Sequence, residues 1–127
     1  MFTTEQTRAQ IAFQKVFAAN VPDEKFTKKY STQCRRLPAL IHQCGFCQAV
    51  AFLQAKSGEA DTDAIRHFLD DFAAAVLHDK TDTSSQHLGQ LARTSQFADY
   101  QWLSRHGLAT ATWFKRYAEA LLPKGED

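Results

Sequence analysis

Apolar residues recur at intervals of three and four positions along almost the whole chain, which is the spacing of one face of an α-helix. In the clearest stretch, about residues 24–44, the apolar positions are Phe26, Tyr30, Cys34, Leu37, Leu40, Ile41 and Cys44. The composition agrees, because 19 Ala, 11 Leu and 11 Gln stand against only four Val and three Ile. The sequence therefore predicts an all-α protein.

Capping and helix-breaking residues divide this pattern into five to six helices. Thr3 with Gln6 three positions later matches a capping box, and Gly58 suits the end of a short helix. The predicted helices start after Thr3, Asp23, Gly45, Asp61 or Thr62, near Gln86, and after Ser95. Pro38 lies within the second helix and removes a backbone hydrogen bond, so the helix either bends or ends there. A chain of 127 residues suits one domain, and we expect residues 1–127 to form a single compact helical bundle.

The same spacing predicts which side chains are buried. On the first, fourth and last helices the predicted inward positions are Ala9, Ala12, Phe13, Val16, Phe17, Ile65, Phe68, Leu69, Phe72, Val76, Phe97, Tyr100, Leu103, Ala111, Phe114, Ala118 and Leu121. Gly107 lies in the interior of the last helix. Since glycine costs about 1 kcal/mol relative to alanine there, we expect another helix to approach closely at this position.

Charged residues are segregated along the chain, although the formal net charge is only +1. Residues 25–56 contain six Lys or Arg and no acid, whereas residues 59–82 contain seven acids against two basic residues. Asp63, Asp70 and Asp71 belong to the acidic segment and are expected to be solvated. This segregation indicates a basic and an acidic face on one small body. The basic face suits phosphate groups, and the acidic face suits a basic protein neighbour, such as another copy.

Two rows of basic residues have helical spacing. Lys28 and Arg35 are seven positions apart, as are Lys29 and Arg36, which predicts all four on one side of the second helix. With the basic residues of the last helix, the predicted phosphate-contacting set is Lys28, Lys29, Arg35, Arg36, Arg105, Lys115 and Arg116. Such rows on adjacent helices would bind a phosphate backbone weakly, with strong salt dependence and no sequence preference. The solubility of surface helices explains the same residues equally well.

The segment from His42 to Cys47 holds a His and a Cys-x-x-Cys pair, but its context favours a structural role. His42, Cys44 and Cys47 provide three of the four ligands of a zinc site, and no second pair follows at the usual spacing. A thioredoxin-like redox centre needs a strand before its first cysteine, and this segment has a helical period. Cys34 lies on the same apolar stripe and is expected in the core. We therefore predict neither a metal nor a cofactor.

Catalysis has one weak candidate in the sequence. Metal-dependent phosphohydrolases of the HD type use a His, a His-Asp pair and a distant Asp, and the chain offers His42, His78 with Asp79, and Asp99 at loose spacing. Signatures of a catalytic triad, a phosphate-binding loop or a zinc protease are missing from the sequence. We predict that the protein is not an enzyme. Two functions remain as alternatives to a helical protein that contacts a phosphate backbone: an HD-like phosphohydrolase, and a helical protein–protein adaptor without RNA contact.

The sequence also predicts a compartment. It contains three cysteines and no N-terminal pattern of a secretion signal. It also lacks an apolar run of the roughly 18 residues that a membrane span needs. We therefore expect a cytoplasmic protein without membrane contact.

Two blocks of the sequence resemble a known family. Residues 30–53 contain a Tyr, then RRLPALI, a Gly and QAVAFL, similar to the family pattern "Y…RKLPALI…NGLGQALAFL". Residues 113–122 read WFKRYAEALL and resemble the family's "WLKRFAEALL". The family is the small helical subunit of the type III-B CRISPR effector, the Cmr complex. The likeness covers about residues 26–56 and 97–124, in the order and separation that the family has.

The resemblance implies a non-catalytic subunit of an antiviral ribonucleoprotein. In that family a few copies stack as a minor filament beside the backbone subunits that hold the guide RNA, and they help to seat the target RNA. The implied partners are the guide RNA–target RNA duplex, the backbone and large subunits of the Cmr complex, and further copies of the chain. Arg35 with Arg36 matches the family's basic pair before Leu-Pro, and Lys115 with Arg116 matches its Lys-Arg pair.

Overall fold

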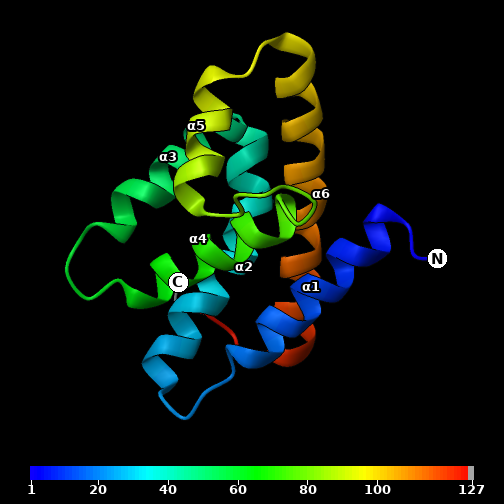
Figure 1. The fold of residues 1–127 in the computed structure, drawn as a ribbon. Helices are drawn as coiled ribbons and strands as arrows, with labels where there is room; N and C mark the ends of the chain where they lie inside the picture. Colours follow the sequence, from blue (N-terminus) through cyan, green and yellow to red (C-terminus); the bar gives the residue numbers. More distant parts are fainter. Residues whose placement is uncertain (126–127) are drawn as a thin grey trace.

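The computed structural model describes residues 1–125, which form six α-helices and no strand (Figure 1). The helices are α1 (Thr4–Ala18), α2 (Glu24–Cys44), α3 (Phe46–Ser57), α4 (Asp63–Val76), α5 (Ser85–Thr94) and α6 (Phe97–Leu121). The prediction of an all-α bundle of five to six helices is confirmed. The predicted domain extended to residue 127, and its last two residues lie outside the described part. Among residues 1–125 no helix combines the length and apolarity needed to cross a bilayer.

Aromatic side chains from four helices form the centre of the core. The ring of Phe68 in α4 packs edge-on against Tyr30 of α2 and Phe114 of α6, with ring centroids 5.5 and 5.6 Å apart. Phe72, one turn later in α4, contacts Phe46 of α3 at 6.3 Å between ring centroids. All five predicted inward positions of α4 are buried. Helix α4 therefore lies between α2, α3 and α6 (Figure 1).

Helix α2 continues without a break through Pro38 and turns directly into α3. It begins where Asp23 Oδ1 accepts hydrogen bonds from the backbone N–H groups of Lys25 and Phe26, at 3.1 and 3.3 Å. It ends at Gly45, whose φ of 88° suits glycine, and α3 starts at the next residue. This tight corner makes α2 and α3 neighbours and creates the space between them that is described below.

The inward prediction fails at three aromatic positions. Phe13, Phe17 and Phe97 are exposed by 43%, 65% and 76%. On α1 the predicted Ala12 and Val16 are buried, and so is Arg8, which is 3% exposed and donates to the carbonyl of Val76 at 2.9 Å, where α4 ends. Phe97 is the first residue of α6, next to the α5–α6 connection at one end of the molecule (Figure 1), and faces solvent.

Two predicted helix caps are also different in the structure. Ser95 ends α5, its N–H donating to the carbonyl of Leu91 at 2.9 Å, and Gln96 precedes α6. Thr62 precedes α4, but its hydroxyl donates backwards to the carbonyl of Glu59 at 2.6 Å rather than capping the helix. Both residues donate a hydrogen bond to a carbonyl of the segment that precedes them. Such local bonds compete with the capping of the next helix that spacing alone suggests.

Candidate functional site

A groove of about 350 Å³ lies between α2 and α3. Its lining residues are Gln33, Arg35, Arg36, Leu37, Ala39, Leu40, Gln43, Phe52, Leu53 and Lys56. The lining is mostly apolar, it includes three basic side chains, and none of the lining residues is acidic. Because positive charge next to apolar surface attracts an anionic ligand with an apolar part, this groove is the best candidate site among the described residues.

Phe52 and Lys56 form the α3 side of the groove. The Lys56 ammonium lies 5.4 Å from the centroid of the Phe52 ring, one helical turn away, and Phe52 is 46% exposed. Neither residue was in the predicted phosphate-contacting set. A signal was present in the sequence, because Phe52 lies off the buried stripe of Phe46, Ala49 and Leu53 and is followed four residues later by a lysine.

The groove continues into a second, more polar space of about 360 Å³ at the loop between α3 and α4. Gln33, Arg36 and Lys56 line both spaces, and the second adds Lys29 and two acids, Glu59 and Asp61. Arg36 and Lys56 therefore lie where the apolar and the polar halves meet.

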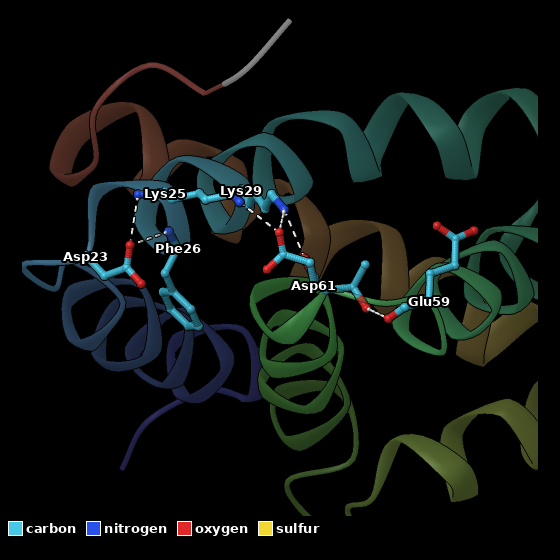
Figure 2. Close-up of polar contacts among 7 residues, drawn as sticks. Asp23, Lys25, Phe26, Lys29, Glu59 and Asp61 are labelled. Atoms are coloured by element: carbon cyan, nitrogen blue, oxygen red, sulfur yellow. Dashed lines mark hydrogen bonds and ion pairs between the residues drawn. The ribbon is translucent and has the colours of Figure 1, made fainter.

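Asp61 neutralises the end of this polar half. Figure 2 shows Lys25 and Lys29, one turn apart on α2, converging on Asp61. Lys25 Nζ lies 2.7 Å from the carboxylate, and Lys29 Nζ lies 3.7 Å from it and donates to the Asp61 carbonyl at 2.9 Å. The hydrogen bond from Lys25 is the main reason that the pKa of Asp61 is lowered. Lys29, a predicted phosphate contact, is thus held by an acid from the α3–α4 loop.

The neighbouring residues Arg35 and Arg36 point to different helices. Arg35 donates to the carbonyls of Ala118 and Leu122 at 3.3 and 3.5 Å, so it caps the C-terminus of α6. Its Nε also donates to the hydroxyl of Ser31 at 3.0 Å. Arg36 is exposed and lines both halves of the groove. Both residues of the predicted basic pair therefore line the groove, but Arg35 also holds α2 to the end of α6, whereas Arg36 lies where the groove meets its polar half.

The other predicted contacts are residues of α2 and α6 that do not line the groove. Lys28 is half-buried on α2, and Lys115 is half-buried on α6, three residues before the Ala118 carbonyl that Arg35 reaches. Arg105 and Arg116 are exposed, and Arg116 pairs with Glu119 one turn later at 3.3 Å. We call these four residues, together with Arg36 and Lys56 of the groove, the basic surface.

Asp71 does not belong to a solvated acidic face, which corrects that expectation. It is 6% exposed and accepts a hydrogen bond of 2.7 Å from the buried hydroxyl of Tyr30. Burial raises the pKa of Asp71, although Tyr30 and the nearby His67 and Lys15 act in the opposite direction. Asp63 and Asp70 are exposed, as expected, and Asp63 pairs with Arg66.

The candidate catalytic residues are not brought together. Within residues 1–125 no three His, Cys, Asp or Glu side chains gather as a metal site requires, so His42, His78, Asp79 and Asp99 do not form an HD-type centre. Cys34 is fully buried, as predicted, and Cys44 and Cys47 are half-buried free thiols at the α2–α3 corner. The Cys47 N–H donates to the hydroxyl of Tyr100 at 3.0 Å, which ties this corner to α6.

Comparison with known proteins identifies one family that this chain matches over most of its length. The model of the CRISPR-associated protein family Cas_Cmr5 matches residues 4–121. A curated protein of Thermus thermophilus, named CRISPR system Cmr subunit Cmr5, is 34% identical over 122 residues, which are 96% of this chain and 98% of that protein. The crystal structure of a CRISPR-associated Cmr5 family protein from Thermus thermophilus matches with a TM-score of 0.82 and 31% identity, covering 95% of this chain and 98% of that one.

Proposed function

The chain belongs to the Cas_Cmr5 family and is a subunit of the Cmr CRISPR complex, and we propose that it is a non-catalytic subunit that contacts the guide and target RNA. The contact is made by the basic surface of α2, α3 and α6. The observation that carries this proposal is the α2–α3 groove, whose lining includes Arg36 and Lys56 and no acid.

The basic surface suits a strand that other subunits hold in place. Lys28, Arg36, Lys56 and Lys115 belong to α2, α3 and α6 of the same bundle, and we expect a phosphate backbone that crosses these helices to contact them. Contacts of this kind neutralise phosphates without reading bases, which gives an isolated subunit low affinity, on the order of 10⁻⁴ to 10⁻⁶ M. The remaining subunits of the Cmr complex supply the other contacts.

A second surface of the chain suits protein partners. Phe13 and Phe17 stack on each other on α1, and Phe13 packs edge-on against Tyr117 of α6 at 5.4 Å. Phe2, Phe13 and Tyr117 line an open pocket of about 550 Å³ whose remaining lining is uncharged. Such exposed aromatic surface is typical of protein interfaces. We assign this aromatic surface to the neighbouring Cmr subunits or to the next copy of the chain.

RNA binding of the full chain over a range of salt concentrations tests the RNA contact. The variant Lys28→Gln, Arg36→Gln, Lys115→Gln removes three cations of the basic surface. Its control is Arg66→Gln, Lys80→Gln, Arg93→Gln, which removes the same charge from exposed positions outside that surface. We expect the first variant to bind more weakly and to lose about 0.7 of the log–log salt slope for each phosphate contact removed from a single strand. Equal behaviour of the two variants would contradict the proposal.

A further inference from the structure

We infer that the α2–α3 groove binds one unstacked nucleobase of an RNA strand, with the base against Phe52 and the adjoining phosphate at Arg36 and Lys56. The inference rests on the proposed RNA contact and names the part of the RNA that this groove takes. A phosphate-contacting surface needs only cations, whereas this groove also presents an aromatic ring and an apolar lining. Those features have no use toward a paired helix, whose bases are stacked inside.

The ring of Phe52 has the exposure that a stacking platform needs. It is 46% exposed while its neighbour Leu53, the next residue of α3, is 1% exposed and holds the helix to the core. Leu40 and Ala39 of α2 face the same groove. A base inserted here covers apolar surface on both sides, and because every base has a flat aromatic face, the contact tolerates any sequence.

The distribution of charge in the groove determines the orientation of the bound nucleotide. Arg36 and Lys56 lie where the two halves of the groove meet, and the polar half beyond them contains Glu59 and Asp61. A phosphate placed farther into the polar half would approach these carboxylates. The favourable position for the phosphate is therefore the boundary, which leaves the base in the apolar half. The side-chain amides of Gln33 and Gln43 line that half and offer donors and acceptors to the edges of a base.

The charge of the lining also favours RNA over a protein segment. The lining residues include three basic side chains and no acid. An ordinary amphipathic helix would gain only an apolar contact in this groove. A nucleotide would use both the cations and the Phe52 ring. A protein occupant would need aliphatic contact with Phe52, and a base needs an aromatic face. A substitution that keeps the apolar contact at position 52 but removes the aromatic ring therefore distinguishes a base from a protein segment.

The experiment measures binding of a fluorescently labelled single-stranded oligouridylate and of a matched RNA duplex by the full chain, with three variants at Phe positions. Phe52→Leu keeps the apolar contact but removes the aromatic face, and Phe52→Trp keeps both. Phe97→Leu is the control, because Phe97 is exposed on α6 and does not line the groove. Thermal unfolding followed by circular dichroism establishes that each variant folds.

We expect Phe52→Leu to weaken single-strand binding about five- to a hundredfold while leaving its salt slope unchanged. Phe52→Trp should retain the affinity, with its indole fluorescence quenched by RNA, and Phe97→Leu should match the unaltered chain. Duplex binding should not depend on position 52. Unchanged single-strand affinity of Phe52→Leu overturns the inference. If the variant Lys28→Gln, Arg36→Gln, Lys115→Gln still binds RNA more weakly in that case, the proposed RNA contact holds without the base-binding groove. Failure of the unaltered chain to bind RNA at low salt overturns both.

Discussion

Gly107 of α6 lies directly against the ring of Phe46 at the start of α3, so closely that a Cβ atom at Gly107 would be 2.7 Å from Cδ1 of Phe46. Phe46 is fully buried, and its ring also contacts Phe72 of α4. The ring therefore has little freedom to move away. The close helix approach predicted from the glycine is confirmed, and it positions the α2–α3 corner against α6.

Replacing Gly107 by Ala should destabilise the protein. Alanine improves helix propensity by about 1 kcal/mol, but overpacking a rigid core position costs about 1–3 kcal/mol, so we expect a net loss in the free energy of unfolding. Urea denaturation measures the change. Gly58→Ala is the control, because Gly58 has an ordinary helical φ of −87° and its nearest neighbour would be 3.6 Å away. A stabilised Gly107→Ala variant would contradict this packing.

Tyr30→Phe should also lower the free energy of unfolding, by about 1–3 kcal/mol, because it leaves the buried Asp71 carboxylate with fewer partners. The substitution removes the donor of the 2.7 Å hydrogen bond to that carboxylate. Burial raises the pKa of Tyr30 well above its usual value, so its hydroxyl stays protonated and donates at all ordinary pH. Tyr117→Phe, at a half-buried position, serves as the control and should change the stability little. Equal effects of the two variants, in chemical denaturation, would refute a role for the buried pair.

The raised pKa of Asp71 predicts a pH dependence with a definite sign. Its pKa in the folded protein lies above the ordinary value of 3.8, so the folded state holds this proton to higher pH than the unfolded state does. Its contribution to stability is therefore fully present below the ordinary pKa and is lost as the pH rises through the raised one. Denaturation of the unaltered chain and of Asp71→Asn between about pH 3.5 and 7 should show the unaltered chain losing stability relative to the variant. A relative gain with rising pH would contradict the raised pKa.

Arg35 and Arg116 should differ in their effect on stability. Arg35→Gln removes the hydrogen bonds that close the C-terminus of α6 and is expected to cost about 1 kcal/mol. Arg116→Gln removes an exposed pair with Glu119 one turn away, which contributes about 0.5 kcal/mol or less. Thermal unfolding of both variants in the same buffer ranks them. The reverse order would mean that Arg35 is not the capping residue.

Asp61→Asn should strengthen RNA binding severalfold if the proposed contact is right. The change removes the carboxylate that holds Lys25 and Lys29 and that would repel a phosphate at the end of the groove. Asparagine is chosen because Asp61 has a φ of 59°, a conformation that Asn tolerates well. Fluorescence anisotropy with single-stranded RNA at low salt measures the gain. Asp70→Asn, which alters the net charge equally at an exposed position on α4, should produce a smaller change.

Local regularities of the sequence determined the helices and their boundaries. The capping box at Thr3, the start of α2 after Asp23 and its end at Gly45 all depend on residues within one turn of each other, and all are confirmed. The resemblance to the family was also visible in the sequence, because each of its two blocks is a short, uninterrupted stretch of residues. The continuous course of α2 through Pro38 was not decided by spacing, since the lost hydrogen bond permits either outcome.

Only the tertiary structure decided what each helix face meets. Arg35 and Arg36 are adjacent in the sequence and both line the groove, yet Arg35 also caps α6 whereas Arg36 extends to the polar half of the groove. Asp71 is buried by Tyr30 rather than solvated with Asp70, and Phe52 with Lys56 completes the groove from a different helix. The helical period predicts which residues share a face, but the chemistry of that face depends on atoms that packing brings from distant parts of the chain.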